Sequence, residues 1–197
     1  MNKIDILIKS KDLLDVNVFK MYLKILYLKE KETYMHSVRV SLYSTQLARE
    51  IGFSDEEVAI VWLSGLLHDM GKLLVPNYIL LGTSTLSENE YSLIRMHPTD
   101  GVMLIKDFVS DRVCKGALEH HERLDGKGYP LGIKNISLIG KIIAIADTFD
   151  AMTSNRTYQN ALPFEECLSR MEELSSFGLY DKNLFVDFKK VIERINN

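Results

Sequence analysis

The chain has 197 residues, a length that suits one domain with a single large core. Hydrophobic residues make up 46% of it and charged residues 26%, which is typical of a globular protein and excludes a disordered one. The net charge of −3 excludes a general attraction to nucleic-acid polymers, so an anionic substrate would need a local cationic site.

The N-terminal segment and the cysteines narrow the class of protein further. No run approaches 18 uninterrupted apolar residues, so the sequence predicts no membrane span. Residues 1–12 mix apolar and charged side chains and lack the apolar core of a signal peptide. Cys114 and Cys167 are too few for a disulfide framework and are not spaced as metal ligands, so we interpret them as buried or half-buried thiols. Together these features predict a cytoplasmic location.

Hydrophobic residues recur at helical spacing along almost the whole chain. Residues 13–26 predict a first amphipathic helix, and residues 32–50 predict a second that ends before Gly52, a favoured residue just beyond a helix. Residues 122–136, which are rich in glycine and contain Pro130, predict an irregular loop. No convincing pair of strands occurs. The sequence therefore predicts an all-α fold, a helical bundle.

Two capping-box patterns mark the starts of further helices. Ser54 with Glu57 predicts a helix that runs to about residue 68, and Ser87 with Glu90 predicts one that ends at residues 97–98. Periodicity alone predicts the remaining helices near residues 99–108, 110–121, 138–155, 163–175 and 182–195.

The first two histidines have carboxylates as neighbours. Glu32 precedes His36 by four residues, so both side chains leave the same face of one predicted helix. His68 and Asp69 are adjacent at a predicted helix end, just before Gly71 can turn the backbone. Both arrangements are typical of metal ligands.

The other three histidines also lie at predicted helix ends. His97 precedes Pro98, which cannot donate a backbone hydrogen bond and marks a boundary, and His120 and His121 close a helix against the glycine-rich loop. Asp147 follows the apolar run 142–146, where a buried, unpaired carboxylate is strongly disfavoured. Binding a cation would remove that cost.

Each of these residues also has a structural explanation. A single histidine at a helix end is more often a cap or a satisfied core residue, and Glu32 could equally be a surface partner of His36. One arrangement nevertheless accounts for all of them together. Imidazole with carboxylate and without thiolate suits iron, manganese or zinc in a hydrolytic site.

The residues also resemble a known family. His36, then His68-Asp69, then Asp147 resembles the H…HD…D signature of the HD phosphohydrolase superfamily. The longer strings at residues 68–72, 97–98, 120–130 and 145–156 resemble the HD-GYP family, and the resemblance covers about residues 32–195. It implies an HD-type helical bundle, with residues 1–28 as an N-terminal lead-in helix and residues 29–197 as the catalytic domain.

The resemblance implies a metal-dependent phosphodiesterase that hydrolyses cyclic di-GMP to pGpG, with further cleavage to GMP left open. It implies two or three divalent metal ions, commonly iron or manganese. A first metal would be held by His36, His68, Asp69 and Asp147. Asp69 would bridge it to a second metal held by His97, His120 and His121. Glu32 matches the extra carboxylate of members with a third metal.

The resemblance also implies catalytic and substrate contacts. Lys72, one turn beyond His68, is either a surface lysine or a phosphate contact beside the metals. Asp150, one turn after Asp147, would orient Lys72 or help to protonate the leaving oxygen. With Asp69 these two residues form the predicted catalytic set. Arg156 resembles a phosphate-clamping arginine, since planar bidentate donors suit phosphate.

The tripeptide at residues 128–130 has two interpretations. The resemblance makes it a lid or a surface for a protein partner, with Tyr129 as a substrate contact. A glycine-containing structural loop is the equally supported alternative. The sequence leaves the oligomeric state open.

Two departures from the family pattern bear on the substrate. Gln159-Asn160 stand where the family usually carries basic residues, and residues 80–85 replace a Lys-Pro-Gly type turn. Both bear on affinity and substrate identity more than on metal binding. Two alternatives to the cyclic di-GMP phosphodiesterase therefore stay open: a hydrolase of another cyclic dinucleotide or nucleotide, and a weakly catalytic receptor for cyclic di-GMP.

Overall fold

The computed structural model of the protein describes residues 16–82, 85–155 and 161–196, and within them it contains helices and no strand. The predicted all-α fold is confirmed. The elements in chain order are α2 (Val16–Lys29), α3 (Lys31–Glu50), α4 (Asp55–Leu67), the 3-10 helix η1 (Met70–Leu73), α5 (Asn77–Leu80), α6 (Glu88–Arg95), α7 (His97–Ile105), α8 (Asp111–Glu119), α9 (Leu138–Thr153), α10 (Phe164–Ser176) and α11 (Lys182–Asn196).

Local sequence signals set most of the helix starts. The side chains of Ser54 and Ser87 each accept a hydrogen bond from the backbone N–H of the glutamate three residues later. The carboxylate of that glutamate accepts one from the backbone N–H of the serine, so both predicted capping boxes are confirmed. Ser137 caps α9 in the same direction through the N–H of Gly140. The predicted irregular loop after α8 is also confirmed.

The helix predicted to end at residues 97–98 ends earlier, and the helix predicted near residues 99–108 begins earlier. α6 ends at Arg95, and α7 begins at His97 with Pro98 in its first turn. Proline is tolerated there because the N–H groups of a first turn have no partner within the helix. The short elements η1 and α5 were not predicted, since each spans only four residues and shows no periodicity.

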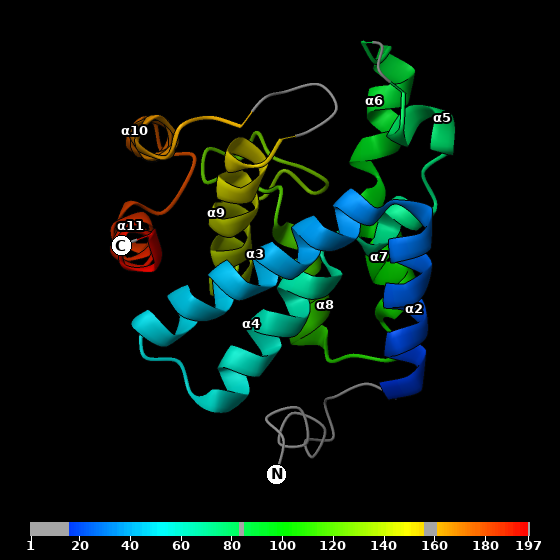
Figure 1. Cartoon of the computed structure of the whole chain (residues 1–197), viewed down its shortest axis with the longest axis horizontal. Helices are drawn as coiled ribbons and strands as arrows, with labels where there is room; N and C mark the ends of the chain where they lie inside the picture. The colour runs from blue at the N-terminus through cyan, green and yellow to red at the C-terminus, as the bar shows by residue number, and fades with distance from the viewer. Residues whose placement is uncertain (1–15, 83–84, 156–160, 197) are drawn as a thin grey trace.

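Helix α3 crosses the middle of the molecule, and the other helices are arranged around it (Figure 1). It packs against α4, α9 and α11, while α8 packs against both α4 and α9. On another side α7 packs against η1 and α8. Helix α2 packs against α3 and η1, and Lys29 at its end donates to the carbonyl oxygens of Leu73 and Val75 at 2.6 and 2.7 Å.

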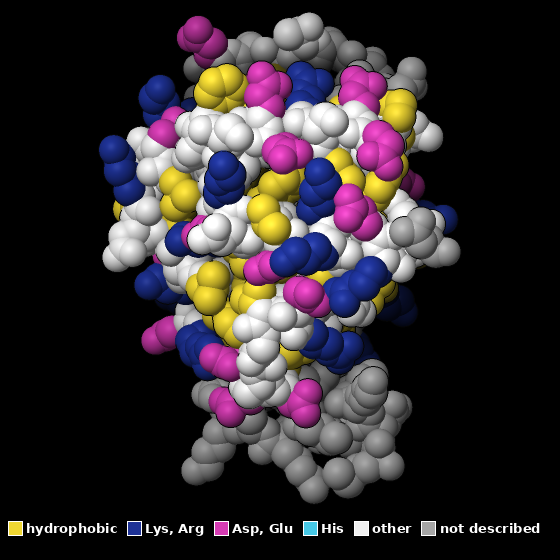
Figure 2. All heavy atoms as spheres, turned by 90° about the vertical axis from the view of Figure 1, so that its left-hand side faces the viewer, with side chains coloured by type: hydrophobic (Ala, Val, Ile, Leu, Met, Phe, Trp, Pro, Cys, Tyr) yellow, Lys and Arg dark blue, Asp and Glu magenta, His cyan; other side chains and the backbone are white. Residues whose placement is uncertain are grey.

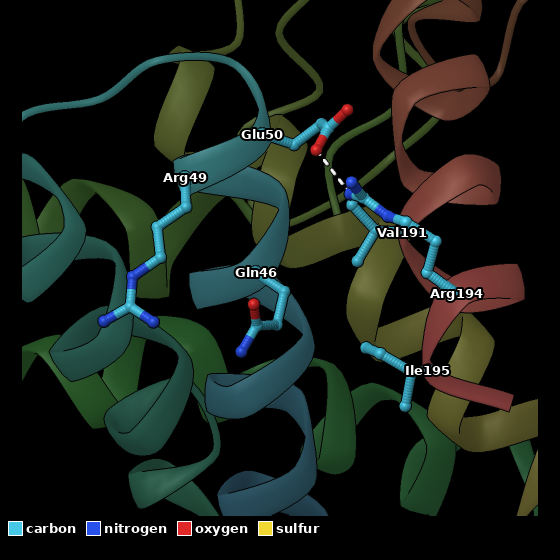
Figure 3. Close-up of a pocket in the computed structure, with 6 residues that line it drawn as sticks. All are labelled: Gln46, Arg49, Glu50, Val191, Arg194 and Ile195. Atoms are coloured by element: carbon cyan, nitrogen blue, oxygen red, sulfur yellow. Dashed lines mark hydrogen bonds and ion pairs between the residues drawn. The ribbon is translucent and has the colours of Figure 1, made fainter. Parts of the chain in front are cut away.

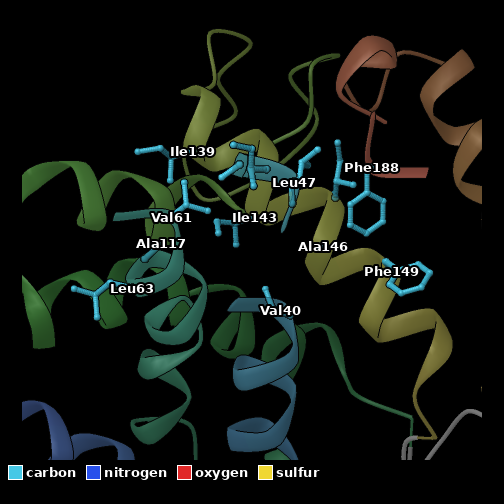
Figure 4. Close-up of a cluster of buried hydrophobic side chains, with 14 of the residues drawn as sticks. Val40, Leu47, Val61, Leu63, Ala117, Ile139, Ile143, Ala146, Phe149 and Phe188 are labelled. Carbon is cyan, nitrogen blue, oxygen red and sulfur yellow. The ribbon is translucent and has the colours of Figure 1, made fainter. Parts of the chain in front are cut away.

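The core lies where α3, α4, α8 and α9 meet, with α11 closing one side (Figure 4). Helix α9 is apolar on nearly every face, and Ile142, Ile143, Ile145 and Ala146 are fully buried. Burying each large aliphatic side chain stabilises the fold by about 1.5–3 kcal/mol. Asp147 therefore lies on a helix that is packed into the core on most of its faces.

The side formed by α10 and α11 has a mixed surface. Lysine and arginine side chains alternate there with aspartate and glutamate, and no histidine is visible among the described residues (Figure 2). Cys114 and Cys167 are free and buried, as predicted. None of the helices in the described ranges combines the length and apolar character that crossing a membrane requires.

Candidate metal centre

Helix ends bring the predicted ligands to one place. His68 is the residue after α4 and Asp69 precedes η1, while His97 is the first residue of α7. His120 and His121 follow α8 directly. His36 on α3 and Asp147 on α9 come from helix interiors.

These side chains form three overlapping groups whose ligand atoms lie within 4.8 Å of one another. The groups are His36–His68–Asp147, His68–Asp69–His120 and His97–His120–His121. All of these side chains are buried except that of His121, which is half-buried. The structure therefore brings together seven of the eight predicted metal ligands.

Three imidazoles are fixed in one tautomer by the backbone. Nδ1 of His68, His97 and His120 lies 2.7, 2.8 and 2.5 Å from the carbonyl oxygen of the residue three positions earlier. A carbonyl oxygen can only accept, so Nδ1 carries the proton in each ring. Each Nε2 therefore presents a lone pair, which is the arrangement that a metal ligand needs.

The lone pairs converge on each other. Nε2 of His97 and Nε2 of His120 are 3.1 Å apart, and burial lowers the pKa of His97 to about 4 and that of His120 well below its ordinary value. Both rings are thus neutral, and neither Nε2 has a proton to share. Among the described residues, His68 Nε2 and Asp69 Oδ1 are also buried without a hydrogen-bond partner. A cation between these atoms would remove the repulsion between the lone pairs of His97 and His120 and would give His68 Nε2 and Asp69 Oδ1 a partner. The residues therefore fit metal ions.

Asp69 lies between the two sides of the centre. Its Oδ2 is 3.4 Å from His68 Nε2 and 3.6 Å from His36 Nε2, whereas its Oδ1 is 3.3 Å from His97 Nε2. Burial opposes its charge, but the Lys72 ammonium at 2.7 Å and His68 hold the pKa of Asp69 well below its usual range. An ionised carboxylate that offers one oxygen to each side suits a bridging ligand.

Asp147 connects α9 to the same centre. Its Oδ1 is 3.0 Å from His36 Nε2, and its Oδ2 is 3.9 Å from His121 Nδ1. Burial opposes the charge of Asp147, but the hydrogen bond from His36 and the nearby His121 hold its pKa well below the ordinary value. Burial lowers the pKa of His121 to about 3, so this ring is neutral as well.

Asp150 has different contacts from those expected. Its Oδ2 lies 2.7 Å from His36 Nδ1, and Arg39 donates to both carboxylate oxygens at 2.6 and 3.0 Å. Lys72 pairs with Asp69 instead. The carboxylate of Asp150 therefore contacts His36 Nδ1, on the opposite side of the imidazole from the Nε2 that faces the centre. Asp150 lies one turn after Asp147 on α9, nearer to α3. There it fixes the orientation of the imidazole, a common support for metal-binding histidines.

Arg39 was not singled out from the sequence, although its position one turn after His36 is a usable signal. We expect Arg39→Met to weaken metal affinity roughly ten-fold, because the Asp150 carboxylate would lose its two hydrogen bonds from Arg39 and keep only the longer one from the Ser154 hydroxyl besides its contact with His36. Titration of metal-free protein with manganese would measure the change. Arg49→Met, on the same helix, is the matched control. Equal affinities in all three proteins would remove Arg39 from the support of the centre.

The remaining predicted residues lie outside the three groups. Glu32 is exposed in the first turn of α3, and its predicted role as a third-metal ligand stays a prediction. Tyr129 stacks on His121, with ring centroids 4.5 Å apart and planes at 28°. Arg156 and Gln159 lie outside the described residues.

A buried glutamate holds the loop that carries Tyr129. The Glu122 carboxylate accepts backbone N–H bonds from Leu131, Gly132 and Ile133 at 2.6–3.2 Å. A Cβ on Gly128 would come within 2.4 Å of the Glu122 Cα, so only glycine allows the loop to pass this close. Loop closure of this kind places Tyr129 over His121.

A pocket at the far end of α3 is separate from the centre (Figure 3). It is lined by Gln46, Arg49, Glu50, Val191, Arg194 and Ile195, and Arg194 pairs with Glu50. Glu50 follows His36 by 14 residues, or roughly 20 Å along a helix. The pocket offers no cluster of imidazoles and carboxylates, so the candidate site is the histidine centre.

The arrangement of the centre agrees with a family match along most of the chain. Residues 20–184 match the model of a family described as the HD domain. The chain belongs to the HD-domain family. The resemblance noted in the sequence is thereby confirmed, and the match begins inside α2, within the segment assigned to the lead-in helix.

Relatives of this HD domain include named phosphodiesterases. A cyclic di-GMP phosphodiesterase of Pseudomonas aeruginosa is 40% identical over 167 residues, which cover 83% of this chain and 40% of that protein. The 3'3'-cGAMP-specific phosphodiesterase 1 of Vibrio cholerae is 39% identical over 160 residues, which cover 80% of this chain and 37% of that protein. The chain thus spans about two fifths of the length of these relatives.

A solved HD domain has the same fold. The HD domain of the L. monocytogenes phosphodiesterase PgpH, in complex with cyclic di-AMP, matches with a TM-score of 0.69. Sequence identity is 19%, and the match covers 89% of this chain and 95% of that one. At this identity the likeness shows the fold alone.

Proposed function

We propose that the chain is a metal-dependent phosphodiesterase that hydrolyses cyclic di-GMP to pGpG, with GMP as a further product to be tested. The observation that carries the proposal is the pair of histidine groups joined by Asp69, in which unprotonated Nε2 atoms of His97 and His120 face each other at 3.1 Å. The cyclic di-GMP phosphodiesterase from P. aeruginosa supports the choice of substrate.

The proposed cofactors are two or three divalent ions, with iron or manganese suited to a set of imidazoles and carboxylates. When bound, such ions polarise the phosphate and make a water molecule acidic enough to act as a nucleophile at neutral pH. His36, His68 and Asp147 would hold one ion, and His97, His120 and His121 another, with Asp69 shared between them. Glu32 is the proposed ligand of a third ion.

The chain's own residues would bind and orient the phosphate. Lys72 is half-buried with its ammonium 2.7 Å from Asp69 Oδ2, so it lies beside the shared ligand and can donate to a phosphate oxygen. Burial raises the pKa of the Tyr129 phenol, which therefore stays protonated and can donate as well. Asp150 acts through His36 as a positioning residue. Arg156 is proposed as a further residue that binds phosphate.

A second candidate is a hydrolase of another cyclic dinucleotide. The V. cholerae relative specific for 3'3'-cGAMP is nearly as similar as the cyclic di-GMP enzyme, and the sequence departs from the family at Gln159 near the proposed phosphate contacts. The two substrates differ only in one base, so the metal centre itself would serve both.

Turnover of a substrate panel tests the proposal. Protein prepared anaerobically with ferrous iron or manganese is supplied with cyclic di-GMP, 3'3'-cGAMP or cyclic di-AMP, and the linear product is measured. We expect the highest kcat/KM with cyclic di-GMP and complete loss of turnover with chelator. A preference for 3'3'-cGAMP would establish the second candidate. Tight binding of cyclic di-GMP without turnover by metal-loaded protein would instead indicate a receptor.

The proposed location is the cytoplasm, and the proposed partner surface is a loop beside the metal centre. A cytoplasmic location is supported by two free, buried cysteines, since extracellular proteins more often pair theirs in disulfides. The loop at residues 128–130 is the proposed surface for a protein partner.

A further inference from the structure

An arginine contacts the aromatic ring of Tyr129, which is stacked on the proposed metal ligand His121. Arg95 is the last residue of α6, two positions before His97. Its guanidinium carbon lies 4.6 Å from the centroid of the Tyr129 ring and 5.8 Å from that of Tyr91. Tyr129 in turn stacks on His121 at 4.5 Å.

Tyr129 therefore contacts both a proposed metal ligand and a cation. The His121 ring and the Arg95 guanidinium each lie at stacking distance from the Tyr129 ring. Arg95 is thus connected to the proposed metal ligands through one aromatic ring.

The charge of Arg95 is not neutralised by a neighbouring acid. Among the described residues, no carboxylate oxygen lies within 4.0 Å of it. The other cations near the centre differ: Arg39 pairs with Asp150 and Lys72 pairs with Asp69, whereas Arg123 donates to the carbonyl oxygens of His120 and Glu122. Stacking uses the face of a guanidinium and leaves the N–H donors at its edge available. Arg95 is half-buried, so these donors are partly withdrawn from water and would bind an anion more strongly.

We propose that Arg95 binds the second, non-reacting phosphate of a cyclic dinucleotide whose first phosphate lies at the metal centre. The inference rests on the proposed function. Both phosphates of such a substrate belong to one ring and are separated by ribose units, so the second phosphate must lie to one side of the metals. A planar, bidentate donor that contacts Tyr129, the ring stacked on His121, suits that position. Arg156, also proposed to bind phosphate, lies outside the described residues.

Kinetics with two substrates test this assignment. Cyclic di-GMP carries a second phosphate, whereas bis(p-nitrophenyl) phosphate carries only one. We expect Arg95→Met to raise the KM for cyclic di-GMP roughly five- to thirty-fold with little change in kcat, because a charge-assisted contact is lost. The change for bis(p-nitrophenyl) phosphate should be several-fold smaller. Arg95→Lys should fall between the wild type and Arg95→Met, and Arg49→Met, which removes the same charge at the far end of α3, is the control.

Each other outcome has a definite meaning. Equal losses on both substrates would overturn the inference and make Arg95 a support for Tyr129 and His121. An unchanged KM for cyclic di-GMP in Arg95→Met would also overturn it while leaving the proposed function intact. Wild-type protein that hydrolyses bis(p-nitrophenyl) phosphate but no cyclic dinucleotide would overturn the proposed function itself.

Discussion

Asp69→Asn is expected to reduce phosphodiester hydrolysis by roughly three orders of magnitude or more, because one carboxylate faces both sides of the metal centre. The amide keeps the shape of the side chain but has no charge, and it leaves the Lys72 ammonium without its partner at 2.7 Å. Metal content should fall together with activity. Elemental analysis and turnover of cyclic di-GMP by the same preparation measure both effects.

Asp107→Asn provides the matched control, since Asp107 is exposed on the segment after α7. It should retain wild-type metal content and rate. Asp69→Asn protein with full metal content and a near-normal rate would contradict the bridging role. Normal metal content with lost activity would show that Asp69 is needed for the reaction but not for holding the metal ions.

Local signals in the sequence were sufficient for most of the fold. A capping box is a contact between residues three apart, so Ser54 and Ser87 could be assigned from the sequence alone. The break between α6 and α7 was predicted at residues 97–98, slightly too late, because Pro98 indicates a boundary without showing that it lies in the first turn of the next helix. Elements as short as η1 carry no periodic signal.

The sequence was sufficient to predict which residues form the metal centre, but not how their side chains contact one another. Histidine and aspartate at helix ends are visible in one sequence, and seven of the predicted ligands do meet. The bond from His36 to Asp150 spans 114 positions, so the support behind that imidazole could not be found without the fold. For the same reason the sequence predicted that Asp150 orients Lys72 or helps to protonate the leaving oxygen, and it gave no signal for the contact of Arg95 with Tyr129.

Close backbone contacts are equally invisible in the sequence, and one of them sets the position of His97. Gly71 in η1 passes so near α7 that an added Cβ would lie 1.9 Å from the carbonyl oxygen of His97 and 2.6 Å from the nitrogen of Gly101. Neither atom belongs to a flexible side chain, so the backbone itself must move. The first turn of α7 would shift and withdraw the His97 imidazole from Asp69, which now lies 3.3 Å away.

We therefore expect Gly71→Ala to lower the free energy of unfolding by about 3 kcal/mol or more, visible as a fall in Tm, and to remove most metal binding at the His97 side. Gly101→Ala is the control from the same crossing. Its Cβ would lie 3.1 Å from the Gly71 nitrogen, a contact that a few tenths of an ångström relieve, and alanine is the better residue within a helix. Its stability should stay within about 1 kcal/mol of the wild type. If calorimetry gives both variants the same Tm and manganese titration gives them the same stoichiometry, the approach of η1 to α7 does not set the position of His97.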